Sequence, residues 1–270
     1  MATILAISSQ VARGSIGLSA IVPALQALGH SVIALPTILL SNHPGYAHVT
    51  GQRTDAAVLK RMVDALDANG WLGEIDTVLS GYLPSPEHVE FVAKTVARVR
   101  RARPHCRYIC DPVLGDDPKG LYIDQAAAAD IRRLLVPVAD ILTPNRFELE
   151  WLTGHPVDTA RTAIVAARTL ATTKVIATSI PSLDDTLLSL QVTQANGVFC
   201  RIPRRASAPN GTGDLLAGLI VGGFTLGRAV AAVDAVLSAS QGFSELQVSQ
   251  ARNSWISAAA IPEVPLDDID

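Results

Sequence analysis

A short segment near residue 211 combines two features that phosphoryl transfer requires. Gly211-Thr212-Gly213-Asp214 stands directly before an apolar run from Leu215 to Val221. Glycines two positions apart free the backbone where a helix begins, so that its N–H groups can converge on an anion. A carboxylate repels an anion, and Asp214 makes chemical sense there if it takes the proton of an alcohol that attacks a phosphate. The segment therefore predicts phosphorylation of a hydroxyl group.

Other polar residues directly follow the short apolar runs that we expect to form strands. In open α/β sheets, ligands bind beyond the carboxyl ends of the strands. These polar residues are therefore expected to wall one continuous cleft at one edge of the sheet. They are Ser8, Ser9, Gln10, Thr37, Ser80, Gly81, Tyr82, Asp111, Gly115, Asp116, Thr143, Asn145, Glu148, Thr178 and Ser179.

Three carboxylates in that set, Asp111, Asp116 and Glu148, are candidate ligands for a hydrated Mg²⁺ beside phosphate oxygens. Magnesium prefers oxygen ligands and keeps several waters, so it needs few direct carboxylates. Two of the three also have a structural explanation. Asn145 and Glu148 have the spacing of a helix capping box, and Asp111 before a proline suits a turn. Both interpretations stay open at the level of sequence.

Several other kinds of site are excluded by their missing motifs. The chain has no G-x-x-x-x-G-K-[ST], so it contains no P-loop. The third glycine of a dinucleotide-binding fingerprint is missing after Gly211 and Gly213, which disfavours a nicotinamide-dependent dehydrogenase. Neither G-x-S-x-G nor H-E-x-x-H occurs, which argues against an α/β-hydrolase and a zinc protease.

Strand-length apolar runs alternate with helical patterns along the chain. We expect strands at 4–7, 32–35 (ended by Pro36), 77–79, 108–110, 140–142 and 175–177, and a hairpin over 186–202. Helices are expected over 16–28, 54–69 and 157–170, after residues 85 and 145, and over most of 212–257, with breaks near Gly227 and Gly242. Residues 37–53 form a connection of a length that is usually functional. The acidic tail from about residue 260 is expected to be loosely ordered.

The strand runs do not alternate polar and apolar residues, which is typical of strands buried on both faces in a parallel sheet covered by helices. We therefore predict one α/β domain over residues 1–270, with three layers (αβα) around a central, mostly parallel sheet. Composition agrees, because hydrophobic residues make up 49%, charged residues 17% and the mean hydropathy is +0.30. A chain of this composition folds rather than staying disordered.

Charge and terminal sequence limit the partners and the location. A net charge of −3 gives no broad basic surface, so we expect no nucleic-acid partner. The amino terminus lacks the basic region of a signal peptide, and the apolar stretch from Leu215 to Gly227 is too short to span a bilayer. A cytoplasmic protein with no membrane association is expected. Its three cysteines lack metal-site spacing and are expected to be buried thiols.

Several longer motifs together resemble the ribokinase superfamily and, within it, the pyridoxal kinases. The superfamily motifs are Cys110-Asp111-Pro112-Val113-Leu114-Gly115-Asp116, Thr143-Pro144-Asn145-Arg146-Phe147-Glu148 and Gly211-Thr212-Gly213-Asp214. The narrower motifs are Ser9-Gln10-Val11-x-Arg13-Gly14-x-x-Gly17, Ser41-Asn42-His43-Pro44-Gly45-Tyr46 and Ser80-Gly81-Tyr82-Leu83. Their order along the chain up to about residue 257 is that of the family, which makes the resemblance more specific than any single motif.

The resemblance implies ATP-dependent phosphorylation of the 5′-hydroxymethyl group of pyridoxal, pyridoxine or pyridoxamine, in the salvage of vitamin B6. It implies that Asp214 is the general base and contacts the substrate, and that Gly211, Thr212 and Gly213 form the anion hole. By similarity, the substrate-binding residues are Ser9, Thr37, Tyr82 and Gly45, and the metal-binding residues are Asp116 and Glu148. The nucleotide-binding residues are Asp111, Thr143, Asn145, Glu148, Thr178, Ser179, Gly211 and Gly213. Mg²⁺, a monovalent cation (K⁺ or Na⁺) and a homodimer are also implied.

The sequence departs from the family pattern at three positions. Gln10 stands where a histidine is usual, Leu18 where asparagine is common, and Asn210 where an apolar residue is frequent. Gln10 and Leu18 are expected to flank the substrate pocket, so the preferred vitamer stays open. Two alternative functions also stay open: a hydroxymethylpyrimidine kinase on the same fold, and a vitamer-binding protein without catalytic activity.

Overall fold

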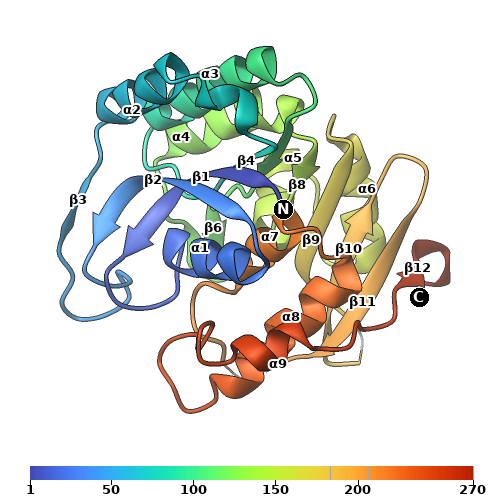
Figure 1. Ribbon diagram of the computed structural model, residues 1–270. Helices are drawn as coiled ribbons and strands as arrows, with labels where there is room; N and C mark the ends of the chain where they lie inside the picture. Colours follow the sequence, from blue (N-terminus) through green and yellow to red (C-terminus); the bar gives the residue numbers. More distant parts are fainter. Residues whose placement is uncertain (183, 206, 270) are drawn as a thin grey trace.

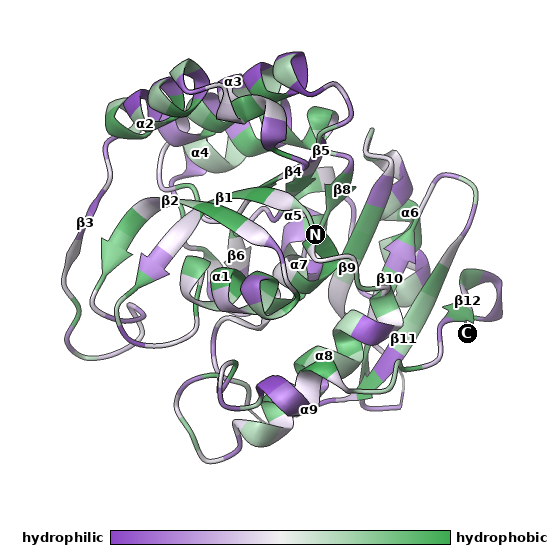
Figure 2. Ribbon diagram, viewed as in Figure 1, coloured by the Kyte–Doolittle hydropathy of each residue, from purple (hydrophilic) through white to green (hydrophobic). Residues whose placement is uncertain are grey.

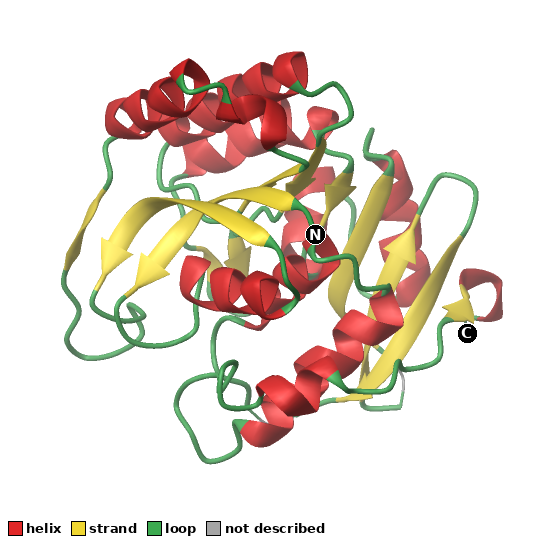
Figure 3. Cartoon of the chain, viewed as in Figure 1, coloured by secondary structure: helices red, strands yellow, loops and turns green. Residues whose placement is uncertain are grey.

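A computed structural model describes residues 1–182, 184–205 and 207–269, and these form a ten-stranded sheet with helices on both faces (Figure 1, Figure 3). The order of the strands across the sheet is β12-β11-β10-β9-β8-β5-β4-β1-β2-β3. Their bounds are β1 Thr3–Val11, β2 Ser31–Leu40, β3 Gly51–Arg53, β4 Thr77–Ser80, β5 Arg107–Cys110, β8 Ile141–Leu142, β9 Lys174–Pro181, β10 Thr186–Val192, β11 Gly197–Pro203 and β12 Val264–Pro265. The remaining two strands, β6 Gly115–Asp116 and β7 Gly120–Leu121, form a separate small hairpin.

Helices occupy most of the connections between strands. Their bounds are α1 Leu18–Ala27, α2 Ala56–Ala68, α3 Pro86–Ala102, α4 Gln125–Asp130, α5 Arg146–Thr153, α6 Ala160–Thr169, α7 Thr212–Val221, α8 Leu226–Ala239 and α9 Arg252–Ile256. Short helical turns lie at η1 Trp71–Glu74, η2 Ile131–Leu135, η3 Val136–Val138 and η4 Leu266–Asp268. None of the helices among the described residues is long and apolar enough to cross a membrane.

Alternate residues of the central strands pack into two separate cores, which confirms the three-layer α/β/α architecture. On β1, Ile4 and Ala6 pack with α1, α7, α8 and α9, whereas Leu5 and Ile7 pack with the helices of the other face, α2 to α6. All four side chains are fully buried. The central strands are therefore mainly hydrophobic, whereas β3 at the edge of the sheet is hydrophilic and exposed, and the outer helices alternate hydrophobic and hydrophilic residues (Figure 2).

The topology places a crevice at the carboxyl ends of β1 and β4. β1 pairs in parallel with β2 on one side and with β4 on the other, and the chain then continues away from β2 through β5, β8 and β9, also in parallel. The direction of strand addition therefore reverses between β1 and β4. Such a switch point leaves a crevice outside the sheet in which ligands bind.

The structure differs from the sequence-based expectation in several segments, including the expected connection over 37–53, whose last three residues form β3. β2 continues through Pro36 to Leu40, because the ladder between β1 and β2 shifts register just after Pro36 and a shifted ladder tolerates a missing N–H. The helical region after residue 212 breaks at Gly222 and Gly223, and Gly227 lies inside α8. Residues 125–138, for which no element was expected, form α4, η2 and η3.

The expectation of a loosely ordered tail is also wrong for the described residues up to 269. Val264 and Pro265 form β12, which pairs with Val198 and Phe199 of β11. Leu266 and Ile269 are buried in the core, and the Glu263 carboxylate accepts the backbone N–H of Gly227 at 2.8 Å. Acidic composition indicated a solvated tail, but the two apolar residues spaced three apart anchor it.

Substitution of Leu266 tests this anchoring. We expect Leu266→Ala to lower the free energy of unfolding by about 2–3 kcal/mol, the lower part of the range for large-to-small core changes, because the site lies near the surface. Urea unfolding followed by circular dichroism measures this loss. Asp267→Ala, a matched control one position along, should change stability by less than about 0.5 kcal/mol. Equal stability of Leu266→Ala and the wild type would mean that the tail contributes nothing to the fold.

Candidate active site

The crevice at β1 and β4 is built by hydrogen bonds to the backbone of Tyr82. The Tyr82 N–H donates to Ser8 Oγ at 3.0 Å, and Thr37 Oγ1 donates to the Tyr82 carbonyl at 2.8 Å. Ser8 and Thr37 are completely buried. Gly81 fits because a Cβ there would lie 2.4 Å from Ser8 Oγ. Thr37, expected to bind substrate, thus holds the segment that carries Tyr82, whose side chain is half-buried.

Ser9 and Gly17 make a second close contact at the end of β1. A Cβ on Gly17 would lie 2.4 Å from Ser9 Oγ, and Gly17 has a φ of 58°. This close approach brings the start of α1 beside the start of α7, which it contacts. Gln10 is exposed beside Ser9, whereas Leu18, the first residue of α1, is buried. That both residues flank the substrate pocket stays a prediction.

The turn that opens α7 has the geometry expected of an anion site. Gly211 has a φ of 103°, and a Cβ there would lie 2.0 Å from the Ser15 carbonyl oxygen, so only glycine fits. Asp214 follows in the first turn of α7 and is half-buried. Burial raises the pKa of Asp214 to about 6, against a smaller lowering by the backbone N–H of Gly17. Such a carboxylate is ionised near neutral pH yet basic enough to accept a proton.

Further carboxylates surround this position. Burial, together with the charges of Glu148 and Asp214, raises the pKa of Asp111 well above its usual value, although Thr143 Oγ1 donates to its Oδ1 at 3.0 Å. The Tyr122 hydroxyl lies in the same field: half of this residue's surface is exposed, yet partial burial and the charges of these three groups and Asp116 raise its pKa. Among the described residues, none of the four carboxylates forms a salt bridge. The site therefore holds an excess of negative charge.

This excess charge predicts an unusual pH dependence of stability. The folded chain raises the pKa of Asp214 to about 6 and of Glu148 to about 7, and raises that of Asp111 further above its usual value. Between about pH 4 and pH 7 the folded state thus binds more protons than the unfolded state, so the free energy of unfolding falls as pH rises. His43, with a lowered pKa, opposes this trend, and the lowered pKa values of Asp64, Glu87 and Asp184 oppose it near pH 4, below the two pH values compared here. We expect a higher Tm at about pH 5.5 than at about pH 7.5.

Differential scanning calorimetry of the ligand-free protein measures the effect. The control is Asp111→Asn, which keeps an oxygen for the Thr143 hydroxyl but removes one repelling charge. It should raise the Tm at about pH 7.5 and flatten the dependence on pH. A Tm that rises with pH across this window would contradict the arrangement of charges described above.

Glu148 anchors a strained turn between Asp111 and Gly115. Its Oε1 accepts the Leu114 N–H and its Oε2 accepts the Asn145 N–H, both at 2.8 Å, and the second bond belongs to a complete capping box. Between these anchors Val113 has a φ of 48°. That conformation is an outlier for a β-branched residue, costs about 1–3 kcal/mol, and persists only where neighbouring contacts enforce it.

The expected magnesium ligands do not come together in a ligand set. The described residues contain no group of three or more His, Cys, Asp or Glu side chains that could hold a metal ion. Both oxygens of Glu148 already accept backbone N–H groups, and Glu148 is 3% exposed. Asp116 is exposed, and its Oδ1 accepts the Asp117 N–H at 2.8 Å. Direct coordination by Glu148 and Asp116 therefore stays a prediction, and a cation there would share the Glu148 carboxylate with the two backbone N–H groups.

The residues expected to bind nucleotide lie side by side at the ends of β8 and β9. The Thr178 N–H donates to the Pro144 carbonyl at 3.0 Å, and Asn145 and Thr178 form an isolated parallel β-bridge. Asn145 Nδ2 donates to the Gly115 carbonyl at 2.9 Å, which ties this region to the turn that Glu148 anchors. Ser179 is exposed and has a φ of 59°, at a register shift between β9 and β10. Thr178 and Ser179 were expected after the strand but lie within it.

The loop from Ser41 to Thr50 packs against the segment that precedes Gly211. His43 Nδ1 accepts the Gly45 N–H at 3.0 Å and lies 3.3 Å from Asn210 Nδ2. The Tyr46 hydroxyl donates to the Ser244 carbonyl at 3.3 Å. Burial, and next the charge of Lys119, lowers the pKa of His43, so its ring is neutral near pH 7. Gly45, expected to contact substrate, is exposed, and its N–H is used within the loop.

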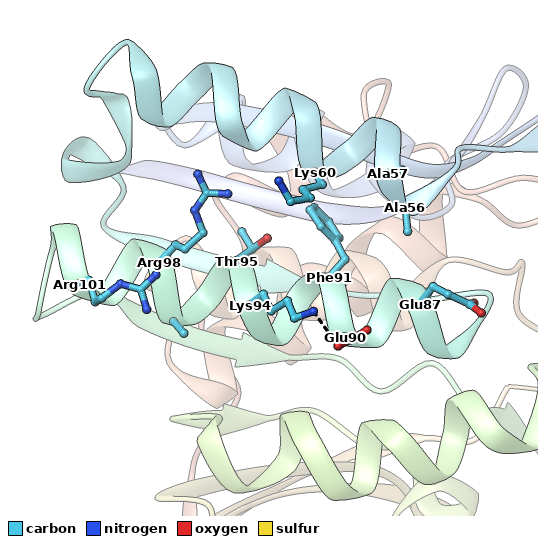
Figure 4. Close-up of a pocket in the computed structure, with 11 residues that line it drawn as sticks. Ala56, Ala57, Lys60, Glu87, Glu90, Phe91, Lys94, Thr95, Arg98 and Arg101 are labelled. Carbon is cyan, nitrogen blue, oxygen red and sulfur yellow. Dashed lines mark ion pairs between the residues drawn. The ribbon is translucent and has the colours of Figure 1, made fainter.

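Two cavities that lie elsewhere lack convergent reactive groups. A cavity of about 430 Å³ lies between α3 and α2 (Figure 4), and one of about 580 Å³ lies on α3 towards α4. They are lined mainly by the stems of charged side chains, of which Lys94 and Glu90 pair at 2.7 Å. A smaller cavity, lined by His43, Tyr46 and Asn210 among others, lies directly beside the α7 turn. Of these three cavities, the small one is the cavity that adjoins residues expected to act in the site.

Comparison with known proteins points in the same direction. The family model for phosphomethylpyrimidine kinase matches residues 13–251. A pyridoxal kinase of Deinococcus radiodurans is 39% identical over 233 residues, which cover 82% of this chain and 78% of that protein. One from Rubrobacter xylanophilus is 34% identical over 270 residues, covering 94% and 93%. The structure of a Leishmania donovani pyridoxal kinase in complex with ADP and pyridoxamine superimposes with a TM-score of 0.92 at 28% identity, covering 98% and 99%.

Proposed function

The chain belongs to the phosphomethylpyrimidine kinase family, and because its curated relatives there are pyridoxal kinases, we propose that it phosphorylates a B6 vitamer with ATP. It is a kinase of the ribokinase-like fold. The acceptor is the 5′-hydroxymethyl group of pyridoxal, pyridoxine or pyridoxamine. The observation that carries the proposal is the Leishmania structure, in which a chain of this fold binds ADP and pyridoxamine together.

In this proposal the vitamer binds between Ser9, Tyr82 and Asp214. Asp214 takes the proton of the hydroxymethyl group as its oxygen bonds to the γ-phosphorus. The bond from that phosphorus to the bridging oxygen of ATP breaks, and ADP leaves. The backbone N–H groups of Gly211, Thr212 and Gly213 stabilise the charge on the transferred phosphoryl group. Most of the acceleration comes from positioning and charge stabilisation, because phosphoryl transfer needs little covalent chemistry from the protein.

The nucleotide occupies the side of β8 and β9 in this proposal. Four of the expected residues lie together there: Thr143, Asn145, Thr178 and Ser179. Asp111 links them to the base, because it accepts a hydrogen bond from Thr143 and the charge of Asp214 raises its pKa. Mg²⁺, which accompanies ATP, and a monovalent cation, which the family resemblance suggests, are part of the proposal, and both would offset the unpaired carboxylate charge. A homodimer and a cytoplasmic location are further parts that the family resemblance suggests.

A second acceptor is favoured by one observation, the match to the phosphomethylpyrimidine kinase model. Hydroxymethylpyrimidine offers a similar hydroxymethyl group on a flat heteroaromatic ring. The exposed Gln10 at the end of β1 stands beside the expected ring position and can distinguish the two by its hydrogen bonds. The curated relatives favour pyridoxal as the better substrate.

A coupled assay for ADP release tests the proposal. Pyridoxal, pyridoxine, pyridoxamine and hydroxymethylpyrimidine are each supplied with ATP and Mg²⁺, and the phosphorylated product is identified by mass spectrometry. Turnover of a B6 vitamer with the highest kcat/KM supports the proposal, and a preference for the pyrimidine supports the second acceptor. Binding of vitamers without any ADP release would instead identify a binding protein.

A further inference from the structure

Resting on the proposed kinase function, we propose that Glu148 is a positioning residue that holds the strained turn at Val113, and thereby places Asp111 at the cleft, rather than a ligand of a metal ion. The proposal concerns a residue whose sequence context suggested magnesium binding. The contacts around it assign both of its oxygens to the backbone instead.

The geometry of Glu148 is that of a clamp across two segments. One oxygen binds the Leu114 N–H in the turn, and the other binds the Asn145 N–H at the start of α5. The two bonds join the segment after β5 to the segment after β8. Because Glu148 is 3% exposed, little of its carboxylate is open to a hydrated ion in the cleft.

The turn requires such a clamp because its backbone is strained. Val113 has a φ of 48°, which a β-branched residue adopts only under constraint. Asn145 Nδ2 holds the Gly115 carbonyl, so the constraint acts on both sides of Leu114. If Val113 relaxed to a negative φ, Asp111 two residues before it and Gly115 two residues after it would move. Gly115 is tightly packed, since a Cβ there would lie 2.3 Å from the Gly120 carbonyl oxygen.

A double-mutant cycle between Glu148 and Val113 tests the proposal. Glu148→Gln keeps the size of the side chain but turns an NH₂ group towards one of the two backbone N–H donors, which breaks that hydrogen bond. Because the turn and Asp111 then move, kcat should fall by about 10²-fold. Val113→Gly alone should change kcat by less than about threefold, because glycine adopts this φ freely. Since glycine lets the turn form without the clamp, the double variant should recover about tenfold of the loss. Additive effects would overturn the proposal.

The magnesium dependence of the rate separates the clamp from a metal ligand. In Glu148→Gln the Mg²⁺ concentration for half-maximal rate should stay within about twofold of the wild type, whereas loss of a ligand would raise it by about tenfold or more. A rise of that size without rescue by Val113→Gly would overturn the proposal. Should Glu148→Gln not fold, Asn145→Ala removes the bond to the Gly115 carbonyl and enters the same cycle, with the same rescue expected.

Wild-type turnover of B6 vitamers is measured first, so that the two failures are distinguishable. Absence of wild-type turnover would overturn the proposed function, whereas normal turnover with an additive cycle would overturn only the role of Glu148. Amide hydrogen exchange at Leu114 and Gly115 needs no turnover and tests the clamp directly. It should be faster in Glu148→Gln than in the wild type, and unchanged exchange would refute the clamp.

Discussion

Asp214→Asn should lower kcat by about 10²–10⁴-fold, the usual contribution of a general base, while the protein stays folded and binds nucleotide. The asparagine has the same shape but cannot accept the proton of the substrate hydroxyl. Because burial raises the pKa of Asp214 to about 6, its replacement also removes an unfavourable buried charge. The Tm of the variant should therefore equal or exceed that of the wild type at about pH 7.5. Loss of activity with gain of stability is the signature expected of a buried carboxylate that serves as the catalytic base.

The pH profile provides the second readout of this prediction. In the wild type kcat/KM should fall below about pH 6, as the carboxylate takes up a proton and ceases to be a base. This acid limb should be absent from the residual activity of Asp214→Asn. Asp158→Asn is the matched control, since Asp158 is exposed and lies outside the site, and it should leave both kcat and the profile unchanged. Turnover of Asp214→Asn near the wild-type rate would remove Asp214 from the role of base.

The arrangement of the sheet could be predicted from the sequence because it depends on local patterns. Short runs of β-branched and aliphatic residues without alternation specify buried strands, and the residues at their carboxyl ends then share one edge of the sheet by geometry. This is why Ser9, Tyr82, Asp111 and Thr143 could be grouped before any coordinates were known. The capping box at Asn145 and Glu148 was likewise readable, because it depends on residues three apart.

The parts that could not be predicted depend on contacts between distant residues. Pro36 is tolerated inside β2 because the ladder with β1 shifts register there. The tail is ordered because β12 pairs with β11 and Leu266 is buried in the core. Glu148 is a further case, because its bond to the Leu114 N–H joins two segments that are distant in the sequence and no local pattern indicates it. The strain at Val113 leaves no mark in the sequence, since glycine rather than valine signals a positive φ.

The second large effect is expected at Gly211. Gly211→Ala should lower kcat by about 10²–10³-fold, the loss found when one donor of an oxyanion hole is misplaced. An alanine at a φ of 103° is strained, and its Cβ would lie 2.0 Å from the Ser15 carbonyl oxygen. The turn must therefore shift, and its N–H groups no longer converge on the transferred phosphoryl group. The strain should also lower the free energy of unfolding, by about 1–2 kcal/mol.

Gly213 is a matched control within the same turn. Its Cβ position is open, with no heavy atom within 4 Å, and it lies inside α7, where alanine is favoured over glycine. Gly213→Ala should therefore raise stability by about 0.5–1 kcal/mol, and it should reduce kcat by less than Gly211→Ala does. Steady-state kinetics and thermal unfolding of the two variants separate backbone geometry from the mere loss of a glycine. If both variants lost activity equally while keeping wild-type stability, added bulk at the phosphate would explain the loss. The left-handed conformation of Gly211 would then not be a requirement for catalysis.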